Sequence, residues 1–238
     1  MIALECEAAL VEATVLAALG GGPAERLFHA ERDPLYAIAD ADESDAAFAA
    51  LHARWFDRLG LDGPLRQALA ERPEIEAGCA RGIVARAPAA RAEVADLLVS
   101  PPGRPHLGLR LTPETLARPE RALALLRHEL LHVADMLDPD FGYEPRLPSA
   151  EGAAFDPAGT GRYRVLWDAY VDGRLVRRGH APPARRAERL SEFRGAFPAL
   201  GERLEATFAR FFDADRCTHA GLIAFATEHG ARASPGAA

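Results

Sequence analysis

The sequence predicts a helix-rich α+β protein, and three observations support this class. Apolar residues recur every three to four positions over most of the chain, which is the spacing of amphipathic helices. Strand-like alternation of apolar residues is confined to the middle of the chain, at 82–87 and 106–111. Of the 238 residues, 49% are hydrophobic and 26% charged, a composition typical of chains that bury a core. We therefore expect a small sheet with helices before and after it.

Patterning divides the chain into three regions. Residues 1–75 are expected to be mostly helical, and residues 76–183 contain the strand-like segments and two long helices. Residues 184–238 are expected to form three further helices, separated by Pro198 and by an acidic stretch at 213–215. We expect the three regions to form one compact unit.

Charge and hydropathy exclude two classes of partner. The net charge is -7 and no basic run occurs, so the clustered positive surface of a nucleic-acid-binding protein is not expected. No stretch approaches the roughly 18 uninterrupted apolar residues of a membrane span. We therefore expect neither nucleic acid nor a membrane as a partner.

Two features predict a cytoplasmic location. The apolar N-terminus is interrupted by Glu5, Glu7 and Glu12 and lacks a positively charged start, so it is a poor signal peptide and is expected to be an amphipathic helix. The cysteines are odd in number and far apart, a pattern that predicts no disulfide framework; they are Cys6, Cys79 and Cys217.

The most informative segment is an expected helix from Pro119 to about Leu137, which Pro139 must end. It contains the pattern H-E-x-x-H. His128 and His132 are four residues apart, so their Cβ atoms lie roughly 5–6 Å apart on one face. Two imidazoles need about this separation to reach one ion at about 2.0–2.1 Å each. The pair therefore predicts a metal site.

Glu129 lies between the two histidines in the sequence but not on their face. A rotation of about 100° per residue places it beside the pair, where its carboxylate can reach a water molecule without binding the ion. A general base in this position accepts the proton of that water as it attacks a carbonyl. We therefore assign Glu129 as a catalytic residue.

The H-E-x-x-H helix, following strand-like segments and with an apolar opposite face, resembles that of the zincin metallopeptidases. The resemblance covers about residues 82–180 and is specific at the motif. It implies a zincin-like core, a Zn²⁺ cofactor and hydrolysis of a peptide bond in a peptide or protein substrate. We expect the substrate backbone to lie along the strand near 106–111, which we predict to be an edge strand.

A catalytic zinc site needs a third protein ligand. A second long helix, expected over 162–180, carries the sequence D-A-Y-V-D, which resembles the E-x-x-x-D of gluzincins with Asp in the ligand place, as in aspzincins. By this resemblance Asp168 binds zinc and Asp172 orients His128. Two alternatives stay open: Asp172 is the ligand instead, or Asp168 forms an ordinary i,i+4 ion pair with Arg164.

Other third ligands are also open. Asp138 follows His132 by six residues, as does the third ligand of some metzincins, but the metzincin glycine is replaced here by Asp135 and no Met-turn exists. Asp135 shares a face with His128, so it is either a carboxylate that supports a ligand histidine or a solvated charge. Cys79, in a Gly-Cys segment, resembles the cysteine ligand of peptide deformylases.

An oxyanion formed in hydrolysis needs a hydrogen-bond donor besides the metal ion. We assign His180 by analogy with gluzincins, although a histidine at this helix end also complements the helix dipole. The tyrosines able to donate instead are Tyr143, Tyr163 and Tyr170. The other histidines lack partner spacing and are expected to be solvated or to cap helices: His29, His52, His106, His219 and His229.

The competing hypothesis is a non-catalytic metal-binding or helical interaction protein with a structural or vestigial site. Glu129 distinguishes the two hypotheses, since a structural site does not need a general base. The sequence leaves open whether the C-terminal helices wall the cleft or form the interface of a homo-oligomer.

Overall fold

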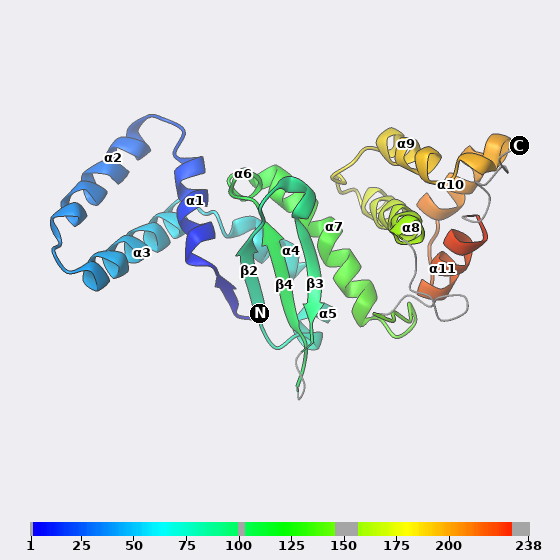
Figure 1. Cartoon of the computed structure of the whole chain (residues 1–238), viewed down its shortest axis with the longest axis horizontal. Coiled ribbons are helices and arrows are strands. Elements are labelled where there is room, and N and C mark those ends of the chain that lie inside the picture. The colour runs from blue at the N-terminus through cyan, green and yellow to red at the C-terminus, as the bar shows by residue number, and fades with distance from the viewer. Residues whose placement is uncertain (1, 100–102, 146–156, 230–238) are drawn as a thin grey trace, which may run out of the picture. The chain divides into compact units, whose positions relative to one another are not determined.

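The computed structural model describes residues 2–99, 103–145 and 157–229 (Figure 1). Helices dominate this part of the chain, and a small mixed sheet accompanies them. The predicted helix-rich α+β class is therefore confirmed. None of the described helices is both long and apolar enough to cross a lipid bilayer.

The chain forms two compact units, Met1–Leu130 and Leu131–Ala238. The boundary falls inside one helix, α7 (Pro119–Leu137), which begins at the predicted proline. It does not coincide with the region limits expected from the sequence, after residues 75 and 183.

The sheet lies in the first unit and has the strand order β1-β2-β4-β3. The β1–β2 and β2–β4 pairs are parallel, whereas β3 runs antiparallel to β4 and forms one edge. The strands are β1 (Leu4–Cys6), β2 (Gly82–Arg86), β3 (Val94–Leu98) and β4 (His106–Leu111).

The strand expected at 106–111 forms as β4, but the prediction that it is an edge open to a substrate is wrong. Residues 107–111 pair with β2 and residues 106–110 pair with β3, so both sides of β4 are occupied. The edges of the sheet are β1 and β3. Strand order depends on the connections between strands, which the alternation within one strand does not encode.

The N-terminus also differs from the prediction of a single helix. Residues 4–6 form β1, and α1 begins only at Ala8 (Ala8–Ala18). Leu4 lies opposite Gly82 of β2, so the strand is defined by a partner far along the sequence. A strand of three residues has no periodicity of its own to detect.

Helix starts in the first unit follow their capping residues. Thr112 caps α6, accepting the Thr115 N–H at 3.3 Å. Asp40, and not Ser44 one turn later, caps α3: its side chain accepts the Glu43 N–H at 2.9 Å. The remaining elements are α2 (Pro23–Arg32), η1 (Asp33–Ala37), α3 (Ala41–Arg58), α4 (Gly63–Ala70), α5 (Pro73–Gly78), η2 (Ala90–Ala92) and α6 (Pro113–Leu116).

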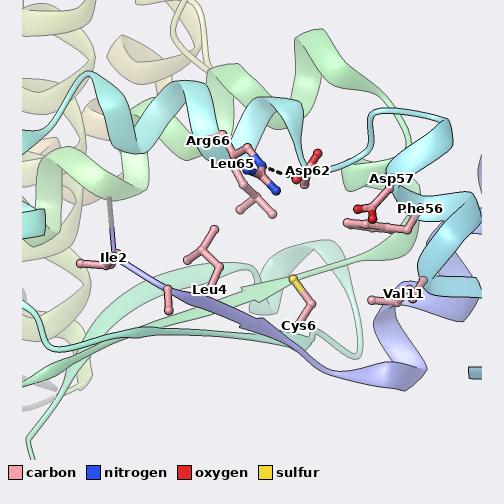
Figure 2. Close-up of a pocket in the computed structure, with 11 residues that line it drawn as sticks. Ile2, Leu4, Cys6, Val11, Phe56, Asp57, Asp62, Leu65 and Arg66 are labelled. Atoms are coloured by element: carbon pink, nitrogen blue, oxygen red, sulfur yellow. Dashed lines mark hydrogen bonds and ion pairs between the residues drawn. The ribbon is translucent and has the colours of Figure 1, made fainter. Parts of the chain in front are cut away.

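A cavity of about 680 Å³ opens in the first unit between β1, α3 and α4 (Figure 2). Ile2, Leu4 and Cys6 of the N-terminal segment line it, and an ion pair between Asp62 and Arg66 lies on the α4 side. Burial and the Asp62 carboxylate raise the pKa of the Cys6 thiol, so the thiol stays protonated at neutral pH. None of the predicted site residues lines this cavity.

The second unit is helical in its described part and packs around α8 (Pro157–Arg177). As predicted, three α-helices follow residue 184, and Pro198 separates the first two: α9 (Arg186–Ala196), η4 (Pro198–Arg203), α10 (Leu204–Phe212) and α11 (His219–Glu228). Aromatic residues fill much of the core, among them Phe193, Phe197, Phe208, Phe211 and Phe212.

Two glycines of α8 differ in the space around them: Gly173 is crowded and Gly161 is not. A Cβ atom added to Gly173 would lie 1.7 Å from the backbone oxygen of Phe212 in α10. Arg177 donates a hydrogen bond to that same oxygen at 2.7 Å, which fixes the close approach of the two helices. A Cβ atom added to Gly161 would have nothing within 4 Å.

We predict that Gly173→Ala lowers the free energy of unfolding by about 2 kcal/mol or more, because the two helix backbones must move apart. Gly161→Ala should raise it by about 0.5–1 kcal/mol, because alanine loses less backbone entropy in a helix. Urea unfolding followed by circular dichroism measures both. Equal effects of the two substitutions would contradict the close contact.

Candidate metal centre

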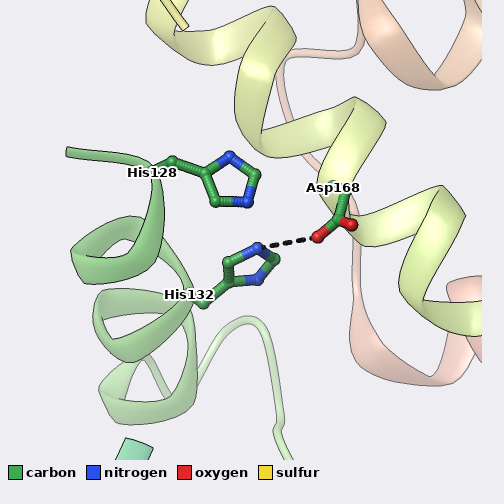
Figure 3. Close-up of side chains that lie close together, drawn as sticks. All are labelled: His128, His132 and Asp168. Carbon is green, nitrogen blue, oxygen red and sulfur yellow. Dashed lines mark ion pairs between the residues drawn. The ribbon is translucent and has the colours of Figure 1, made fainter. Parts of the chain in front are cut away.

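Three of the predicted ligand residues lie together on α7 and α8. His128, His132 and Asp168 each offer a ligand atom, and these atoms lie within 4.8 Å of one another (Figure 3). His132 Nε2 lies 3.1 Å from Asp168 Oδ1. Both histidines are buried, and the Asp168 side chain is 15% exposed.

This donor set fits a metal ion. Two imidazoles and one carboxylate are the three protein ligands of many catalytic zinc sites, which keep a fourth position open. The same set also suits non-haem iron(II). Among the residues that the structure describes, one group of three or more His, Cys, Asp or Glu side chains has ligand atoms close enough to share an ion. It consists of His128, His132 and Asp168.

The other third-ligand candidates lie outside this group. Asp138 follows the end of α7, accepts the Asp140 N–H at 2.9 Å and lines a separate cavity of about 270 Å³. Cys79 is buried at the end of α5, where its carbonyl accepts a hydrogen bond from Arg104. Asp172 is fully buried and binds Arg189, and its predicted role toward His128 stays a prediction.

Glu129 has a contact that the sequence did not reveal. Its side chain is buried, and Oε2 accepts the backbone N–H of Ala95 in β3 at 2.9 Å. The carboxylate thereby ties α7 to the edge strand of the first unit. Its second oxygen, Oε1, has no partner in the described part of the chain. The presence of a glutamate at this position therefore has a structural explanation.

Asp135 was expected either to support a ligand histidine or to be a solvated charge, and its burial contradicts the second alternative. It is 4% exposed and accepts the Trp167 Nε1–H at 2.7 Å. The Arg174 guanidinium donates to both of its oxygens, at 2.8 and 2.6 Å. The Trp167 ring meets the His132 imidazole edge-on, with centroids 4.4 Å apart and an angle of 88°. Asp135 is therefore linked to His132 through the Trp167 ring.

Arg189 of α9 reaches the carboxylates of α8. Its Nε donates to Asp172 at 2.6 Å, and its Nη1 lies 3.5 Å from Asp168 and 2.8 Å from Glu192. Although burial opposes the charged form, the Asp172 and Asp168 carboxylates raise the pKa of Arg189 above its ordinary value. Arg189 is therefore a fixed positive charge beside the candidate site.

Trp167, Arg174 and Arg189 are the site residues that sequence reasoning missed. For Trp167 and Arg174 a weak signal existed: Trp167 precedes Asp168 directly, and Arg174 follows Asp168 by six residues on the same helix. Arg189 lies on another helix, and nothing local to it indicates the contact.

The structure does not bring His180 to the three-residue group. Arg177 follows Asp168 by nine positions, a rise of roughly 13 Å along α8, and His180 follows the helix end. There its backbone N–H donates to Leu175 O at 3.0 Å, after Gly179 at φ 75°. The oxyanion role of His180 therefore has no geometric support.

The candidate tyrosines pack in the core of the second unit. The Tyr163 hydroxyl lies 2.8 Å from His219 Nδ1, and burial raises the pKa of this tyrosine. Tyr170 lies under the Arg174 guanidinium at 4.1 Å, and Tyr143 packs near Trp167.

Two histidines differ from the expectation of solvated or capping residues. His52 and His219 are buried, and Thr218, not His219, caps α11. Burial lowers the pKa of His219, so the imidazole is neutral at pH 7.

Comparisons of the chain with protein-family models, with curated proteins and with solved structures found no match. The resemblance to zincins therefore rests on the motif and on the local geometry of the candidate site.

Two Asp–Arg pairs of the second unit predict opposite responses to loss of charge. Asp135 and Arg174 have side chains only 6% and 15% exposed, whereas those of Asp140 and Arg216 are 71% and 79% exposed. Asp135→Asn should lower the free energy of unfolding by about 3 kcal/mol, because it leaves a buried guanidinium without its counter-charge. Asp140→Asn should change it by less than about 0.5 kcal/mol. Urea unfolding of the two variants measures both changes. Equal changes in the free energy of unfolding would show that the buried pair stabilises the fold no more than the exposed pair.

Proposed function

We propose that the chain is a zinc-dependent metallohydrolase that cleaves peptide bonds at a zincin-like site. In this proposal His128, His132 and Asp168 bind the ion, and Glu129 is the general base. The convergence of two imidazoles and a carboxylate within 4.8 Å is the observation that carries the proposal. A zinc ion bound there supplies a Lewis acid, which lowers the pKa of water towards 7 and polarises a substrate carbonyl.

The chain's own residues account for the proton transfer. Glu129 Oε1 is the oxygen available to accept a proton, since Oε2 already accepts the Ala95 N–H. That hydrogen bond holds the carboxylate in one orientation, so its geometry is set before the substrate arrives. The position of the His132 ring is supported by packing: the Trp167 ring lies against it, and Asp135 holds Trp167 by a hydrogen bond.

The interior position of β4 changes the proposed location of the substrate. An extended peptide adds to a sheet only at an edge, and near α7 that edge is β3, whose Ala95 contacts Glu129. We therefore propose that the substrate backbone lies along β3. We also propose a reducing, cytoplasmic location, which the three unpaired cysteines support.

A structural metal site is the second candidate function, and one observation favours it. The Ala95 contact gives Glu129 a role in fixing α7 to the sheet that requires no catalysis. A site of this kind would bind the ion equally well and would hydrolyse nothing.

The metal centre is tested by elemental analysis of the purified chain and of three alanine variants. We expect about one zinc per chain in the wild type, and its loss in His128→Ala and in Asp168→Ala. Asp138→Ala is the matched control and should retain the metal, because Asp138 lies outside the group. A wild-type chain that contains no metal after zinc is supplied would refute the metal site. Bound iron in place of zinc would refute the zinc-dependent mechanism but not the site.

Catalysis is tested by replacing Glu129 in two ways. Glu129→Gln keeps an acceptor for the Ala95 N–H but removes the base, so hydrolysis of labelled casein should fall about 100-fold or more, with zinc content and stability retained. Glu129→Ala should lose stability as well, because the buried N–H is left unpaired. An active Gln variant would refute the base, and a zinc-bound but inactive wild type would support the structural site.

A further inference from the structure

The two oxygens of the Asp168 carboxylate face different partners. Oδ1 lies 3.1 Å from His132 Nε2, on the side of the candidate metal centre. Oδ2 lies 3.5 Å from Nη1 of Arg189. One oxygen is therefore turned towards the histidine and the other towards a guanidinium.

Arg189 is held in place by groups other than Asp168. Its Nε donates to Asp172 at 2.6 Å and its Nη1 donates to Glu192 at 2.8 Å, and the side chain is only 10% exposed. A guanidinium is planar and presents its donors in a fixed fork. The two shorter contacts therefore set the position of Arg189, and the carboxylate of Asp168 orients itself to a cation that is already fixed.

Negatively charged groups gather around Arg189. Three carboxylates surround one guanidinium: those of Asp168, Asp172 and Glu192. The Asp172 side chain is fully buried and the Asp168 side chain is 15% exposed, so negative charge here is costly. A divalent cation bound to Asp168 would add positive charge to this cluster.

We propose that Arg189 is a positioning residue that restricts Asp168 to one ligand oxygen. This rests on the proposed function, because it takes Asp168 to bind the ion. A carboxylate can bind a metal ion through one oxygen or two, and a second oxygen would occupy the position that a catalytic site keeps open. By holding Oδ2, Arg189 leaves that position free for water or substrate.

Cobalt(II) in place of zinc tests this without measuring activity. The visible absorption of cobalt(II) is strong in four-coordinate sites and weakens as the coordination number rises. In Arg189→Lys the positive charge remains near Asp172, but a single ammonium cannot fork between two carboxylates. We expect this variant to keep about one cobalt per chain and to lose intensity in the visible band.

A double variant, Arg189→Met with Asp172→Asn, removes the guanidinium without leaving a buried charge unpaired. It should show the same loss of intensity. Two matched controls keep Arg189: Asp172→Asn, and Glu192→Gln, which alters a partner of the same Nη1 atom. Both controls should keep the wild-type spectrum, because the Asn and Gln side chains retain an oxygen that accepts the hydrogen bond from Arg189. Circular dichroism checks that each variant is folded.

The possible results distinguish the role of Arg189 from the existence of the metal centre. Bound cobalt with the wild-type spectrum in both Arg189 variants would overturn the role of Arg189 and leave the metal centre intact. Equal loss of intensity in Asp172→Asn would assign the effect to Asp172 and also overturn the proposal. A wild-type chain that binds no cobalt would overturn the metal centre itself, and the role of Arg189 with it.

Discussion

The candidate site depends on one stretch of α7 in which polar side chains are buried on every face. All residues from 128 to 135 are buried, and four of them are polar: His128, Glu129, His132 and Asp135. Each such group must find a partner, because an unpaired polar group in the interior costs a large part of the stability of a domain. Glu129 finds a backbone amide of β3, Asp135 finds Trp167 and Arg174, and His132 finds Asp168.

Much of the site could be predicted because its information is local. The bounds of α7 follow from two prolines, and the separation of His128 and His132 follows from helical geometry alone. Asp168 was favoured because its helix carries two carboxylates one turn apart, a pattern that can be read within a few residues. The α+β class was predictable for the same reason, since periodicity within each segment reveals its type.

What the sequence did not reveal is set by contacts between distant segments. β1 exists only because β2, almost eighty residues later, pairs with it, and the edge position of β3 depends on how the strands are connected. Asp135 shares a helix face with His128, yet its partners lie on α8. Arg189 reaches Asp168 from another helix, so spacing within α8 could only suggest the nearer Arg164.

The contacts of Asp168 bear on the proposed metal site, because this carboxylate meets an imidazole on one side and a guanidinium on the other. His132 Nε2 lies 3.1 Å from Asp168 Oδ1. Arg189 already occupies the second oxygen of Asp168, and Asp172 and Glu192 add further negative charge around it. In the proposed site a divalent ion would add positive charge beside these carboxylates and use both imidazoles as ligands. The acidic side chains around Arg189 and the spacing of the histidines on α7 therefore support the same proposal, a bound cation.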